Sequence, residues 1–254
     1  QYYVYFIDRF RLEYQLGKGH PFLECHCHQS SMIYQKEDSP SLFLINRNWK
    51  KYHKKFDRYE DSFHHDHEIH RVQLERLISE DAYNSVFTSF EELINYDLEF
   101  LEELYTGDRT YDININQRIN NLVMYLPELR SNFVRKKQSE CFIAELFAKA
   151  KKAISDDDII YDTEMFEALR IIQESLFEMI NARFIELKHL IKKHYKKSEK
   201  FEQQKVSVEE GFKDEIIGKV TEKILSFVQP EQMYLFHQAS HGEVTTYYLL
   251  LIGY

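Results

Sequence analysis

The sequence predicts a mainly α-helical fold, in which a multi-helix N-terminal domain precedes the start of a small α/β unit. Only 7 glycines and 4 prolines occur in 254 residues, so few positions interrupt a helix. Apolar residues also recur at steps of three and four over long stretches. Near Pro230 the pattern changes to that of a strand. We therefore expect a helical domain over residues 1–204 and, over 205–254, a helix plus the beginning of an α/β domain.

The first helix is expected over residues 2–16, ended by Gly17 and Gly19. Its apolar positions include Val4, Ile7, Phe10 and Leu12. The next segments are expected to be irregular over 20–42, helical or mixed over 42–56, and a charged helix over 63–77.

Ser79 has the character of an N-cap, because Glu80 and Asp81 follow it where the helix dipole favours acidic side chains. The helix that it begins should extend to Gly107. Its expected buried face consists of Phe87, Phe90, Leu93, Ile94, Leu98, Leu101 and Leu104. Two further helices are expected over 113–126 and 128–153.

The clearest amphipathic pattern begins at Thr163 and predicts one helix over 163–204. We expect its first half to be core and its second half to be solvated, since the apolar stripe is Met165, Leu169, Ile172, Leu176, Met179 and Ile180. Ser207 to Glu210 form a capping box that predicts a last helix. The side chains expected to be buried on it are Phe212, Ile216, Val220, Ile224 and Phe227.

Composition excludes several classes of function. The net charge of −9 argues against broad, non-specific binding to nucleic acid or anionic membranes, although a local basic patch is compatible with it. The sequence shows no apolar run long enough for a membrane span and no signal peptide. Three cysteines make no disulfide framework, so a reducing cytoplasm is expected. No phosphate-binding glycine loop or catalytic triad is recognisable, and we expect no enzyme activity, no catalytic residue and no cofactor.

Both ends of the chain suggest a fragment. The first residue is Gln1 rather than Met, and Tyr247 to Tyr254 form an apolar strand with no evident partner. An unpaired apolar strand promotes aggregation. We therefore expect the α/β unit to be truncated.

A local basic segment occurs near the end of the long helix. Residues 183–205 contain eight lysines and arginines against three glutamates, a net charge of +5. The plain interpretation is an exposed helix end, where cations suit the dipole. The functional interpretation is a surface that binds nucleic-acid phosphates. Its candidate residues are Lys192, Lys193, Lys196, Lys197 and Lys200. A protein partner or a homodimer is the alternative.

Two clusters contain metal-ligating residue types. Cys25 and Cys27 would share one side of an extended segment, but a structural zinc site needs four ligands and only Cys141 or scattered histidines could complete it. His67 and His70 are three residues apart on an expected helix, one residue short of the zincin spacing. We favour buried or idle thiols and a solvated polar helix face, and we expect no metal site.

Leu235-Phe236 and Gly242-Glu243 have the spacing of the first strand and turn of the minimal nucleotidyltransferases, which this segment resembles. His237, Gln238 and His241 replace the family's Gly-Ser and Arg. The metal-binding Asp-x-Asp position falls within Thr246 to Leu250, and these side chains cannot hold Mg²⁺. The resemblance therefore implies a degenerate transferase domain, within a nucleotidyltransferase and helical nucleotide-binding (HEPN-type) system.

Asp97-Leu98-Glu99-Phe100, Thr106-Gly107 and Asp112 are similar to a stretch of the RteC family, which are regulators encoded on conjugative transposons of Bacteroidetes. Tyr5-Phe6 and Phe10 to Glu13 fit the same family's aromatic N-terminal pattern. The resemblance implies a helical, DNA-associated regulator without catalysis. We favour this function, a non-catalytic regulatory or interaction protein associated with nucleic acid, over a component of a nucleotidyltransferase system.

Overall fold

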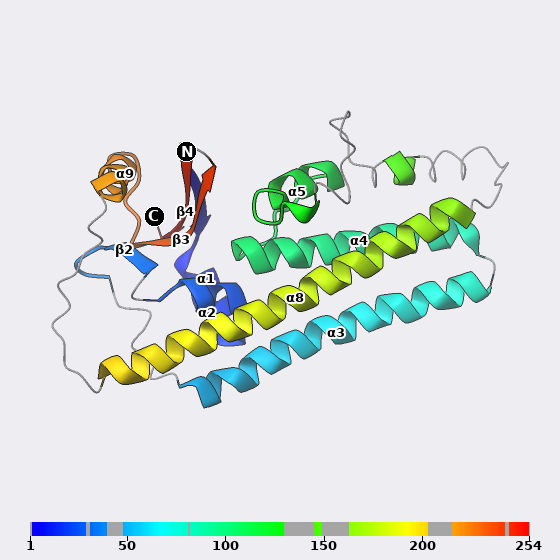
Figure 1. Cartoon of the computed structure of the whole chain (residues 1–254), viewed down its shortest axis with the longest axis horizontal. Helices are drawn as coiled ribbons and strands as arrows, with labels where there is room; N and C mark the ends of the chain where they lie inside the picture. Colours follow the sequence, from blue (N-terminus) through cyan, green and yellow to red (C-terminus); the bar gives the residue numbers. More distant parts are fainter. Residues whose placement is uncertain are drawn as a thin grey trace. The chain divides into compact units, whose positions relative to one another are not determined.

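A computed structural model describes residues 2–28, 31–39, 48–80, 82–129, 145–148, 163–202, 215–241 and 244–253. The protein is mainly helical with a small mixed sheet, as expected (Figure 1). It divides into two compact units. Unit 1 comprises Gln1–Tyr59 and Leu187–Tyr254, and unit 2 comprises Glu60–Glu186. This division does not coincide with the boundary expected after residue 204.

Unit 1 contains a sheet of strand order β1-β4-β3-β2. The strands are β1 (Tyr2–Ile7), β2 (Met32–Gln35), β3 (Gln232–His241) and β4 (Val244–Ile252). β4 is parallel to β1 and antiparallel to β3, and β3 is antiparallel to β2. The two ends of the chain are therefore joined in one sheet.

Two expectations about the chain ends were wrong. Residues 2–7 form a strand and not the start of a helix. The terminal apolar strand, expected to lack a partner, has one on each side: Leu249 lies opposite Val4 of β1 and Leu235 of β3. Aromatic and β-branched residues suit a strand, but only the pairing with β4 makes that conformation favourable here.

Helices cover both faces of this sheet. On one face, Met233, Leu249 and Leu251 pack with Val220 and Ile224 of helix α9 (Glu215–Leu225). On the other face, the ring of Phe236 meets the ring of Phe22, from helix α2 (Pro21–His26), edge-on at 5.1 Å. The alternation of side chains along each strand separates the two layers.

The buried face of α9 differs from the expected one. Ile217 is buried and Val220 and Ile224 are half-buried, whereas Ile216 and Phe227 are exposed. The capping-box residues Ser207 to Glu210, and Phe212, lie outside the described residues. Periodicity found the helix and its packing residues Val220 and Ile224, but it placed Ile216 and Phe227 inward, because the buried face depends on where the sheet lies.

Helix α1 (Arg9–Lys18) begins at Asp8, whose carboxylate accepts a hydrogen bond from the Arg11 backbone N–H at 2.8 Å. It ends at Gly19, which has φ 89° and so needs the left-handed region that glycine tolerates. Gly17 lies inside the helix rather than ending it. Residues 20–42 were expected to be irregular, but they contain α2 and β2.

Helix α3 (Trp49–Ser79) is one helix, where two separate segments were expected. Ser79 is its last residue and not the cap of the next helix, because its hydroxyl donates back to the Arg76 carbonyl at 2.7 Å. Helix α4 (Tyr83–Thr106) instead starts after Ala82. It ends at Gly107, with φ 87°, as the sequence predicted.

Unit 2 has its core among α3, α4 and helix α8 (Thr163–Glu202), which lie alongside one another (Figure 1). The ring of Phe63 on α3 lies 4.5 Å from Phe100 on α4 and 5.9 Å from Phe184 on α8. All seven residues expected on the buried face of α4 are buried. Helix α5 (Ile115–Leu122) packs against α4 and begins with a capping box of Asn114 and Gln117. The helix expected over 128–153 lies mostly outside the described residues.

Helix α8 confirms the long helix predicted from Thr163. Leu169, Ile172, Leu176 and Ile180 are buried as expected, and Met179 is half-buried. The expectation of a solvated second half was wrong as far as Ile191, because the buried stripe continues through Phe184, Leu187 and Ile191. The charged residues between these positions, Glu186 and Lys188, hid the stripe from a reading based on charge. Beyond Ile191, Lys192, Lys193 and Lys196 are exposed as expected.

We expect Leu176→Ala to lower the free energy of unfolding by about 2–5 kcal/mol, because the side chain is fully buried and its loss leaves a cavity. The matched surface change Lys196→Ala should shift stability by less than about 0.5 kcal/mol. Urea unfolding of both variants measures the difference. Equal stability of the two variants would contradict the assigned core.

Candidate nucleic-acid interface

Aromatic packing joins the start of α3 to the end of α8 within unit 1. The rings of Tyr52 and Tyr195 stack with centroids 5.8 Å apart and planes 17° from parallel. Trp49 lies 6.2 Å from Tyr195. Tyr52 is only 2% exposed. This packing fixes which sides of the two helix ends face outward.

The predicted lysines lie on the outward side of α8. Leu187 and Ile191 are fully buried, so the helical period turns Lys192, Lys193 and Lys196 outward, and all three are exposed. Lys197 and Lys200 belong to the same helix, but their side chains lie outside what the structure describes. The structure therefore brings together the first three predicted residues on one helix end.

The start of α3 adds cations that our sequence reasoning missed. Lys50, Lys51 and Lys54 are exposed. We call these three residues, with Lys192, Lys193 and Lys196, the basic surface. The sequence contained a signal, because residues 49–58 hold five cations against the one carboxylate of Asp57. The sequence could not show that this segment lies near the end of α8, since about 140 residues separate the two segments.

The carboxylate of Asp57, near the start of α3, is already paired. The Asp57 carboxylate accepts from Lys188 Nζ at 2.9 Å and lies 2.8 Å from His53 Nδ1. Among the described residues, no carboxylate forms an ion pair with any lysine of the basic surface. The surface thus concentrates positive charge on a chain whose net charge is −9.

Cys25 and Cys27 are buried thiols with a structural role. Cys25 and Cys27 are 1% and 3% exposed, which confirms the expectation of buried thiols. Cys25 lies in helix α2 and not in an extended segment. Burial raises the pKa of the Cys27 thiol, with the Glu24 carboxylate adding to the effect. A thiol held in its neutral form is a poor metal ligand and nucleophile. Cys141 lies outside the described residues.

The histidine-rich run is only partly the solvated face that we expected. His65 is exposed, but His67 is 4% exposed and faces the core of unit 2. Its Nε2 atom lies 2.8 Å from Gln173 Nε2 on α8 and 3.7 Å from Asp97 Oδ1 on α4. Its ring stacks on Phe177 at 4.3 Å. A polar side chain from each of three helices therefore meets inside the bundle.

Burial raises the pKa of the Asp97 carboxyl, while hydrogen bonds and charge from His67 and the bond from Gln173 oppose the shift. A carboxyl with a raised native pKa binds more protons when folded than when unfolded. Its contribution to stability is therefore complete below the ordinary aspartate pKa of about 4 and is lost as pH rises through the raised value.

Asp97→Asn should consequently gain stability relative to the parent protein as pH rises from about 4 to about 7, because asparagine stays neutral throughout. Thermal unfolding of both proteins across this range provides the measurement. If the variant instead lost stability relative to the parent protein as pH rises, an ionised Asp97 would be stabilising and our interpretation of its burial would be wrong.

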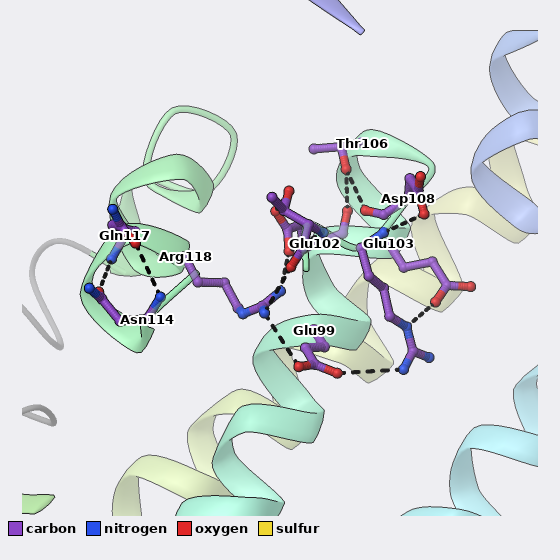
Figure 2. A network of polar contacts seen from close by, with 10 residues as sticks. Glu99, Glu102, Glu103, Thr106, Asp108, Asn114, Gln117 and Arg118 are labelled. Atoms are coloured by element: carbon purple, nitrogen blue, oxygen red, sulfur yellow. Dashed lines mark hydrogen bonds and ion pairs between the residues drawn. The ribbon is translucent and has the colours of Figure 1, made fainter. Parts of the chain in front are cut away.

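Two residues of the stretch similar to the RteC family, Glu99 and Thr106, lie in a polar network that joins α4 to α5 (Figure 2). Arg118, on α5, pairs with Glu102, and its Nη2 atom lies 3.3 Å from Glu99 and donates to the Thr110 carbonyl at 3.1 Å. The Arg118 and Glu102 side chains are only 5% and 3% exposed. Thr106 donates through its hydroxyl to the Glu102 carbonyl at 2.9 Å. These residues maintain the α4–α5 turn.

Arg118→Met should destabilise the protein by about 3–5 kcal/mol, because it leaves the buried Glu102 carboxylate without its cation. Removing both charges in Arg118→Met/Glu102→Leu should recover part of that loss. The exposed pair of Arg170 and Glu167 provides the control, and Arg170→Met should cost less than about 1 kcal/mol. Chemical unfolding distinguishes these cases, and a neutral Arg118→Met would show that the network is not structural.

The transferase-like segment takes a different path from the expected one. β3 does not end at Phe236 but continues, after an irregularity at Leu235 to His237, as far as His241. There it pairs with β4 as a hairpin. Gly242 and Glu243 lie outside the described residues.

The chain has no match among family models, curated proteins or solved structures. In the part of the chain that the structure describes, no helix is long and apolar enough to cross a membrane. Nor do any three histidine, cysteine, aspartate or glutamate side chains there form a group suited to a metal ion.

Proposed function

We propose that this chain is a non-catalytic regulatory protein that binds nucleic acid through the basic surface. One observation carries the proposal. Six exposed lysines from two helix ends gather on an acidic chain without a carboxylate partner among the described residues. Lys197 and Lys200 extend the same lysine sequence along α8.

The phosphate groups of a nucleic acid suit this surface better than the scattered carboxylates of an acidic protein do. Lysines neutralise phosphates and release their condensed counterions, which favours binding at low salt. The remaining carboxylates of the chain repel nucleic acid, but at about 0.1 M salt charges beyond about 10 Å are largely screened. Direct lysine–phosphate contacts are screened less, so a local surface can bind although the net charge is −9.

The resemblance to RteC regulators supports the same class of function. It is carried by residues of β1, of α1, of α4 and of the turn that follows α4, and the basic surface lies on other elements. Two separate features of the chain therefore support a function associated with nucleic acid. We also propose a cytoplasmic location, which the buried thiols of Cys25 and Cys27 support because they need no oxidising compartment.

Charge reversal tests the proposal. Lys193→Glu/Lys196→Glu should weaken binding of a labelled oligonucleotide and reduce the salt slope of log K by at least about two. The control, Lys36→Glu/Lys223→Glu, makes the same charge change at exposed lysines outside the basic surface and should bind like the parent protein. Fluorescence anisotropy between about 50 and 200 mM salt measures both. Equal losses in the two variants, or no binding by the parent protein, would refute this function.

A further inference from the structure

The only tryptophan of the chain lies within the basic surface. Trp49 is the first residue of α3, is half-buried, and precedes Lys50 and Lys51 directly. Lys192 from α8 places its Nζ atom 5.9 Å from the centroid of the Trp49 ring. A cation of α8 thus lies near the ring, two exposed lysines follow it directly in α3, and part of the ring stays accessible.

Neighbouring side chains fix the position of this ring. His53, one turn along α3, meets it edge-on at 5.1 Å. Tyr195 supports it from α8 and donates a hydrogen bond through its hydroxyl to Glu24, while the Tyr52 hydroxyl donates to the Gly19 carbonyl at 3.1 Å. A ring that is already ordered loses little entropy when a ligand stacks on it.

An ordered aromatic ring beside exposed lysines is suited to an unpaired nucleobase. In a duplex the base faces are covered by their neighbours, whereas a single strand can place a base on an aromatic ring and its phosphates on nearby cations. We infer that the ligand is single-stranded nucleic acid, with one base stacked on Trp49 and the backbone held by Lys50, Lys51, Lys192 and Lys193. This inference rests on the proposed function and specifies its substrate class.

The competing explanation is that Trp49 only packs the helix start. The two explanations differ in their consequences for the form of nucleic acid. A packing role predicts that Trp49 substitutions change stability and affect single strands and duplexes equally. A stacking role predicts a selective effect on single strands.

The experiment uses the full chain with a labelled oligo-deoxythymidine of about 16 nucleotides and, separately, its duplex. Anisotropy reports binding, and intrinsic tryptophan emission reports stacking, since Trp49 is its only source. We expect tighter binding of the single strand, with quenching that saturates together with the anisotropy. Trp49→Ala should weaken single-strand binding roughly tenfold to hundredfold, the range for one stacked base, and leave duplex affinity unchanged.

Trp49→Phe keeps an aromatic face and should retain most of the affinity, while thermal unfolding of both variants detects any loss of fold. Binding without quenching, or equal losses for single strand and duplex, would overturn the stacking role and leave the proposed function standing. No binding of either form by the parent protein would overturn both.

Discussion

Unit 1 depends on the packing between the start of α3 and the end of α8. Both segments are rich in lysine, so bringing them together costs electrostatic energy. That cost is modest, because two exposed charges 4 Å apart interact by about 1 kcal/mol in water and less when further apart. The free energy gained by burying apolar side chains, which opposes this cost, is larger. Tyr52, Phe56, Leu187 and Ile191 are all nearly or fully buried, and each such side chain contributes about 1.5–3 kcal/mol. Hydrophobic packing therefore imposes the clustering of positive charge, and a ligand of negative charge would relieve it.

The same packing holds the other helices of unit 1. Tyr52 and Lys55 donate hydrogen bonds to the carbonyls of Gly19 and Gly17 at the end of α1, at 3.1 and 2.8 Å. Tyr195 pairs with Glu24 of α2, and α2 in turn covers one face of the sheet through Phe22. Four segments distant in sequence thus converge on one aromatic cluster. In unit 2, by contrast, buried polar groups help to join the helices, as Asp97 with His67 and Glu102 with Arg118 show.

Sequence reasoning succeeded where structure depends on local periodicity. The buried face of α4 and the extent of α8 were predicted because a helical stripe is encoded within a few turns. It failed where distant segments decide the outcome. Tyr2 to Ile7 become a strand because β4 offers an edge more than 200 residues away. His67 is buried because Gln173 and Asp97 meet it from two other helices. The α8 lysines of the basic surface were found by counting charges in the sequence, whereas the α3 lysines were recognised only from the fold. The functional proposals remain predictions from chemistry.

The proposed function requires nucleic acid to contact the basic surface. Lysine footprinting tests it most directly: the protein is acetylated with and without excess oligonucleotide, and each site is quantified by mass spectrometry. We predict protection of Lys50, Lys51, Lys54, Lys192, Lys193 and Lys196, with unchanged modification of the exposed Lys36 and Lys223. Protection confined to other lysines, or spread evenly over all of them, would contradict the proposed function.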